Sequence, residues 1–314
     1  MLLYLKPKME EENFMKKYII SLISFLIIIS ASNTQAGDYV RTKIIEASWG
    51  NLDDQFGLVL EAEGNCPQSM TVDDRGNLAI LDLVNNRVQL YSSTGKWMGK
   101  FTVYCRAFDI KFMKDHITVL APYDYLIEQY NPQGELIKRI PINKRIDLMD
   151  GLRIIGDQIC VQTAEQMQYN IKQQSLKKQL ETQQLGFSGS QLDRKFQTRW
   201  IDPHKGYLII NDTKTGKRRT VTITTKEKLV SVVFLDTDGN GNIYIRKELF
   251  DDTGDCYFEV DKFNINSEVV NTIRIKNENI VAPFKPITVN SKGNVYYLEI
   301  KSEGFSVISW QQQN

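Results

Sequence analysis

Residues 69–101 read SMTVDDRGNLAILDLVNNRVQLYSSTGKWMGKF and predict four short β-strands joined by three tight turns. The turns contain Gly-Asn, Asn-Asn and Thr-Gly pairs, and Gly and Asn tolerate the positive φ that a tight hairpin needs. The second strand, residues 78–81, is apolar throughout, whereas the third alternates as a half-buried strand does. The segment therefore predicts a four-stranded antiparallel unit with a buried second strand.

The apolar second strand recurs along the chain. Successive copies are 39, 42, 48, 36 and 52 residues apart, which suits the roughly 40 to 50 residues of one four-stranded propeller blade. We therefore expect an all-β fold, a six-bladed β-propeller. The six copies begin at Leu78, Ile117, Ile159, Tyr207, Ile243 and Val295.

The last repeat lacks a fourth strand, because only one more strand, residues 305–310, fits before the C-terminus. The segment Tyr39–Ala47 precedes the first blade and has nothing else to pair with. We expect it to close the last blade, which protects strand edges that would otherwise aggregate. In the fourth repeat, no fourth strand is evident in the sequence.

The N-terminus predicts an extension and a signal peptide, residues 1–36. Two lysines precede the apolar run 19–29, and small residues lead to a cleavage point after Ala36. The run is shorter than the roughly 20 residues that span a bilayer, although an uncleaved anchor is the alternative. We expect residues 37–314 to be one exported domain, periplasmic or extracellular, with no membrane insertion after signal cleavage. The possible start codons are Met1, Met9 and Met15, of which Met15 suits the signal best.

Charge narrows the range of partners. The chain has a net charge of +1, and residues 1–36 hold four lysines and three glutamates, so the remaining domain is neutral. Nucleic-acid binding leans on a basic surface. We therefore expect no nucleic-acid partner.

Four cysteines in an exported chain permit disulfides, and three pairings are possible. Cys66 and Cys105 stand just before the first strand of successive repeats, where neighbouring blades bring equivalent positions close together. They are the disulfide candidate, with two unrelated buried thiols as the alternative. Cys160 and Cys256 fall within predicted strands and are expected to pack as small apolar groups.

The first repeat resembles an NHL repeat, on the turn Arg75-Gly-Asn, the run Ile80-Leu-Asp82 and the segment 85–91, NNRVQLY. The segment 49–57, followed by residues 64–69, resembles the entry of exported bacterial six-bladed members, most of which have no assigned activity. The rest of the chain resembles the family by its periodicity rather than by its motifs. The resemblance implies that Asp82 and Arg87 hold the second and third strands together. It also implies a range of functions, from binding proteins or nucleic acids and sensing ligands to metal-dependent lyase or lactonase chemistry, so the fold does not decide the function.

One loop resembles the start of a calcium site. Asp236, Asp238 and Asn240 alternate, with Gly241 at the sixth position, as in an oxygen-ligand loop. The twelfth position is Lys247, which cannot supply the usual carboxylate. A lengthened Gly-Asn hairpin is the favoured interpretation, so no cofactor is expected and calcium is the alternative.

The chain contains only two histidines, so no catalytic residues are assigned. Basic and amide side chains are expected around the channel mouth, and a basic rim suits an anionic group. We expect a non-enzymatic binding module for a protein or a small anionic ligand. The candidate rim residues are Gln68, Arg106, Arg199 and Lys285.

Two other functions stay open. A lactonase-like hydrolase or lyase would hold a divalent metal with carboxylates at the channel, and a structural envelope component would need no site. The carboxylates near inner strands are Asp109, Asp147, Asp150 and Asp202.

Overall fold

A computed structural model describes residues 39–61, 65–142, 146, 149–155, 158–163, 168–171, 186–187, 194–212 and 214–313. They belong to the compact unit Asp38–Asn314. The predicted signal peptide, residues 1–36, and Asp147 lie outside the described residues, as does the side chain of Asp150. Regular structure in the described part is β, apart from a short 3-10 turn at Pro122–Asp124 and 3-10 conformation at Ile171, so the expected all-β class is confirmed.

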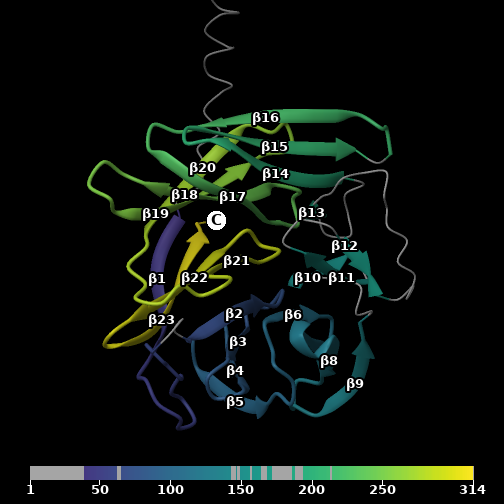
Figure 1. The fold of residues 1–314 in the computed structure, drawn as a ribbon, viewed down its shortest axis with the longest axis vertical. Coiled ribbons are helices and arrows are strands. Elements are labelled where there is room, and N and C mark those ends of the chain that lie inside the picture. The colour runs from purple at the N-terminus through teal and green to yellow at the C-terminus, as the bar shows by residue number, and fades with distance from the viewer. Residues whose placement is uncertain are drawn as a thin grey trace, which may run out of the picture. The chain divides into compact units, whose positions relative to one another are not determined.

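The described strands form six sheets, and the strands that pair within them are antiparallel (Figure 1). Three sheets follow the first three repeats: β2 (Pro67–Val72), β3 (Leu78–Asp82), β4 (Arg87–Tyr91) and β5 (Trp97–Thr102); β6 (Asp109–Met113), β7 (His116–Ala121), β8 (Leu126–Tyr130) and β9 (Leu136–Pro141); β10 (Met149–Ile155), β11 (Gln158–Thr163) and β12 (Gln168–Asn170). Three more follow: β13 (Gly186–Phe187), β14 (Arg194–Asp202), β15 (Lys205–Asp212) and β16 (Arg218–Thr224); β17 (Lys228–Thr237), β18 (Ile243–Phe250), β19 (Cys256–Phe263) and β20 (Val269–Lys276); β21 (Ile287–Val289), β22 (Val295–Lys301), β23 (Gly304–Gln312) and β1 (Tyr39–Ala47).

The N-terminal strand closes the last sheet, as the sequence predicts. β1 pairs antiparallel with β23, with Tyr39 opposite Gln312 and Ala47 opposite Phe305. Ile45 is the buried residue of β1 and packs in a cluster that also contains Phe305. The two ends of the described chain are therefore joined by backbone hydrogen bonds.

The additional strand of the fourth sheet pairs at an edge that the sequence did not predict. β16 ends at Thr224 and β17 begins at Lys228, which leaves no room for an outer strand. The short strand β13 instead pairs with β14, so the strand order is β13-β14-β15-β16. β14 and β15 of this sheet contact β17.

The core lies between sheets. Five clusters of buried apolar side chains each combine residues from two neighbouring sheets. The strand β3 is buried along its whole length because both of its faces are covered, which is why its sequence does not alternate. Through these clusters the sheet of β2–β5 contacts the sheet of β6–β9 on one side and the last sheet on the other.

Asp82 and Arg87 hold β3 to β4, as their family resemblance implies. They are opposite each other in the register, and Arg87 Nε donates to Asp82 Oδ2 at 2.9 Å with both side chains buried. Arg87 also donates to the carbonyls of Asn51 and Gln55, at 3.1 and 2.6 Å. The pair thus also anchors the loop that precedes the first sheet.

The candidate disulfide between Cys66 and Cys105 is absent from the structure, which matches the alternative of two unrelated buried thiols. All four cysteines lie in the described residues, and all are free thiols. Cys66 packs between the first and last sheets, whereas Cys105 packs between the first and second. Equivalent repeat positions therefore put the two thiols on opposite faces of the first sheet, because each packs against a different neighbouring sheet.

Candidate functional site

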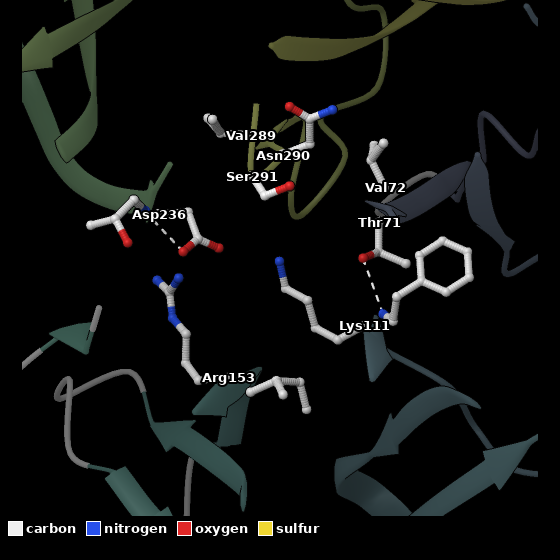
Figure 2. Close-up of a pocket in the computed structure, with 11 residues that line it drawn as sticks. Thr71, Val72, Lys111, Arg153, Asp236, Val289, Asn290 and Ser291 are labelled. Atoms are coloured by element: carbon white, nitrogen blue, oxygen red, sulfur yellow. Dashed lines mark hydrogen bonds between the residues drawn. The ribbon is translucent and has the colours of Figure 1, made fainter. Parts of the chain in front are cut away.

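Residues from five sheets meet at one cavity (Figure 2). Its volume is about 180 Å³, and its walls come from the ends of β2, β6, β10, β17 and β21 and from the turn after β21. We call it the axial cavity, because these are the first strands of their sheets. Its lining residues are Thr71, Val72, Lys111, Phe112, Arg153, Ile154, Asp236, Thr237, Val289, Asn290 and Ser291.

The polar lining residues occupy matching places in the repeats. Thr71, Lys111 and Arg153 each stand one or two residues before the last residue of the first strand of their sheet, and each is followed by an apolar residue. In β17 the pairing with β18 shifts between Phe234 and Asp236, and this irregularity brings Asp236 to the cavity. Sequence reasoning did not select Thr71, Lys111 or Arg153, although their similar place in the repeats was a signal that could have found them, and it selected Asp236 only as a calcium-loop candidate.

The guanidinium of Arg153 is fixed in place. Its Nε donates to Gln162 Oε1 at 3.0 Å within the same sheet. Its Nη1 and Nη2 donate to the carbonyls of Leu235 and Phe234 at 2.6 and 3.0 Å, and the Phe234 ring centroid is 5.2 Å away. Arg153 therefore links the third sheet to the fifth, and two of its five N–H donors carry no hydrogen bond within the described structure.

Lys111 has no such fixation. Its ammonium points into the axial cavity in Figure 2, and it makes no hydrogen bond or ion pair with any described residue. Asp236 accepts a hydrogen bond from the backbone N–H of Thr237 at 2.9 Å. Two cations and one carboxylate thus line the cavity without ion-pairing to one another, and they leave one net positive charge.

The neutral polar groups of the cavity are held by their neighbours. Thr71 Oγ1 accepts from Phe112 N at 3.2 Å, which ties the first sheet to the second. Ser291 Oγ is 2.7 Å from Asp74 Oδ1, which ties the last sheet to the first. The buried amide of Asn290 closes its own turn by accepting from the backbone of Lys292. The walls are therefore organised before any ligand binds.

A second polar cluster lies further along the same strands. Asp109 is two residues before Lys111 in β6, so the two share a face. Asp109 is fully buried; its Oδ1 accepts from Ser69 Oγ at 2.6 Å, and its Oδ2 accepts from Leu152 N at 2.7 Å and from Lys285 Nζ. These contacts join four sheets. Gly151 stands against this pair, because a Cβ there would lie 2.4 Å from Lys285 Nζ.

Burial acts against the charge of both groups in this cluster. For Asp109, burial alone would raise the pKa, but Lys285, Lys111 and the Leu152 N–H together hold the pKa below its ordinary value. For Lys285, burial lowers the pKa, and the attraction of Asp109 offsets this only in part. The carboxylate is thus held charged by the contacts that surround it.

The structure brings together two of the four predicted rim residues. Gln68 Oε1 accepts from Phe284 N, and the Gln68 carbonyl accepts from Lys285 N, each at 2.9 Å. Arg106 lies on the surface and pairs with Asp124 at 2.7 Å. Arg199 is exposed within β14 rather than ahead of it.

The calcium-loop residues serve different parts of a hairpin. Asp238 Oδ1 accepts from the backbone of Asn240 and of Asn242, at 2.9 Å each, and its Oδ2 accepts from Tyr244 at 3.0 Å. Asp236 faces the axial cavity instead. Asp202 accepts from His204 N in another turn. In the part of the chain that the structure describes, no three His, Cys, Asp or Glu side chains are grouped to hold a metal ion.

Comparison by sequence finds no matching family model and no matching curated protein. Among solved structures, the chain is similar to a protein of unknown function from Bacteroides thetaiotaomicron, at 14% identity and a TM-score of 0.55, covering 88% of this chain and 77% of that one. It is similar to a member of the DUF4221 family from Bacteroides vulgatus, at 10% identity and 0.51, covering 89% and 100%. A virginiamycin B lyase from Staphylococcus aureus matches at 9% identity and 0.41, covering 88% and 100%.

The sheets and these likenesses define the class of protein: the fold is a β-propeller. At such low identity the likenesses show the fold and no activity. Within the described residues, no helix is long and apolar enough to cross a membrane.

Proposed function

We propose that this chain is an exported, six-bladed, NHL-type propeller that works as a binding module rather than an enzyme, and that its axial cavity takes a small anionic ligand. The unpaired ammonium of Lys111 inside the cavity carries this proposal. An ammonium in a partly enclosed site is stabilised by an opposite charge. The fixed guanidinium of Arg153 adds a second cation at the same cavity.

The dimensions of the cavity favour a small ligand over a protein segment. A volume of about 180 Å³ has room for on the order of ten water-sized groups and is below the usual size of a drug-binding pocket. Apolar walls from Val72, Ile154 and Val289 would cover the carbon skeleton. A single carboxylate would balance the one net positive charge.

Thermal denaturation with a series of anions tests the proposal. Acetate, hexanoate, malonate, sulfate and phosphate are added to the protein at constant ionic strength, because a ligand that binds only the native state raises Tm. We expect at least one anion to raise Tm, and Lys111→Met to abolish that rise. Lys96→Met, at an exposed turn of the first sheet, is the matched control and should keep it.

Two outcomes would contradict the proposed anion site. If no anion raises Tm, or if Lys111→Met responds like the parent protein, the axial cavity is not an anion site. The same assay with EDTA and with calcium examines the metal-dependent alternative. A large shift with either one would favour that alternative over a binding module.

A further inference from the structure

The axial cavity contains a hydrogen-bond acceptor that a simple anion does not satisfy. Asp236 lines the cavity beside the basic residues, and its one described hydrogen bond comes from Thr237 N. An ionised carboxylate only accepts hydrogen bonds, and its charge weakens the binding of a ligand that is purely anionic. A ligand that also brings a hydrogen-bond donor to Asp236 would therefore bind more tightly than a simple anion.

The surroundings of Asp236 favour a hydroxyl over an ammonium as that donor. Arg153 donates to the carbonyl of Leu235, the residue next to Asp236, and Figure 2 draws its guanidinium on the same side of the cavity as the Asp236 carboxylate. An ammonium at Asp236 would face this guanidinium. A hydroxyl can donate to Asp236 and accept from Arg153, because it has both functions.

The remaining walls match the same chemistry. Thr71 and Ser291 present hydroxyl groups from two further sheets, and Asn290 lies beside them. Phe112 and the aliphatic side chains give the cavity apolar patches that suit the C–H face of a carbon skeleton. The polar groups come from several sheets, so they can form hydrogen bonds with more than one hydroxyl of a ligand.

We propose that the ligand of the axial cavity is a carboxylic acid with several hydroxyl groups, a sugar acid or a compound of that class. Its carboxylate lies at Lys111, and its hydroxyls bridge Asp236 and Arg153. This inference rests on the proposed function, because it assumes that the cavity binds an anion.

Calorimetric titration of the full chain with matched linear six-carbon compounds tests this inference. Gluconate and galactonate carry both features, hexanoate lacks the hydroxyls, sorbitol lacks the carboxylate, and 6-aminohexanoate replaces hydroxyls with an ammonium. We expect the better of the two sugar acids to bind about tenfold or more tightly than hexanoate, because one hydrogen bond to a charged group is worth about that factor. Sorbitol and 6-aminohexanoate should bind more weakly than the sugar acid.

Two substitutions separate the roles of the charged residues. Asp236→Asn should lower sugar-acid affinity about tenfold and raise hexanoate affinity, because it removes both an acceptor and a repulsive charge. Lys111→Met should lower the affinity for both acids. Asp252→Asn, at an exposed turn, is the matched control and should change neither.

Each alternative has its own result. If hexanoate or 6-aminohexanoate binds as tightly as both sugar acids, or if Asp236→Asn leaves their ratio unchanged, the sugar-acid inference is wrong while the anion site stands. If neither hexanoate nor a sugar acid binds, or Lys111→Met has no effect, the proposed function itself is wrong. A native melting transition for each variant shows that the variant is folded.

Discussion

Lys285, just before β21, and Asp109 of β6 form an ion pair, although 176 residues separate them in the chain. The carboxylate is completely buried, and Ser69 and the Leu152 backbone use its other acceptor sites. This pair fastens the last sheet to the second, next to the axial cavity. It accounts for one of the predicted rim residues, because Lys285 is held by a buried partner.

Asp109→Asn should destabilise the protein by about 3 kcal/mol, because it leaves the Lys285 ammonium beside a neutral group in a largely buried site. Urea denaturation measures the change. Asp252→Asn, at an exposed turn, should change stability by less than about 0.5 kcal/mol. If the two substitutions cost the same, the ion pair does not stabilise the fold.

Acid should weaken this ion pair by protonating the Asp109 carboxylate. The pKa of Asp109 is lowered in the folded protein, so its contribution is present above the ordinary value of 3.8 and is lost as pH falls through the lower folded pKa. The stability difference between the parent and Asp109→Asn should therefore be constant near neutral pH and shrink below about pH 4. Urea titrations at a series of pH values measure it, and a pH-independent difference would contradict the assignment.

Arg87→Lys should destabilise the first sheet and the loop that precedes it. The guanidinium reaches Asp82, Asn51 and Gln55 at once, and a single ammonium cannot reproduce that fork. We expect a loss of about 2 kcal/mol and faster hydrogen exchange in the loop of residues 50–57. The exposed Arg75→Lys should leave both properties unchanged.

Alkylation of the denatured, unreduced protein should modify four cysteines. In the native state Cys66 should resist alkylation, because it is fully buried and its burial raises the pKa of the thiol to about 12. Peptide mass spectrometry measures both. Detection of a Cys66–Cys105 disulfide would contradict this prediction and support the pairing suggested by the repeat positions.

Removal of the closing strand should expose an edge. A chain truncated through Ala47 leaves β23 without its partner, and unpaired strand edges promote association. We expect a lower Tm and oligomers in light scattering. A chain that begins at residue 37 is the control, and a monomeric truncated chain would show that the closure is dispensable.

Local pattern was enough to place most of the strands. Uninterrupted apolar runs such as β3 predict burial on both faces, and Gly-Asn pairs predict the turns, because both depend on neighbours along the chain. The orphan segment Tyr39–Ala47 predicted the closure by elimination. The pattern did not find β13, because two residues carry no periodicity, and it did not find the opposite packing of Cys66 and Cys105.

The sequence by itself thus determined the all-β class, the repeat and the strand that closes it. Only the tertiary structure decided which polar residues meet. Lys111, Arg153 and Asp236 come from three sheets, and the last reaches the cavity through an irregularity in the pairing of β17. Strand formation follows from neighbouring residues, whereas a cavity at the axis depends on how the sheets are arranged around it, which no single repeat encodes.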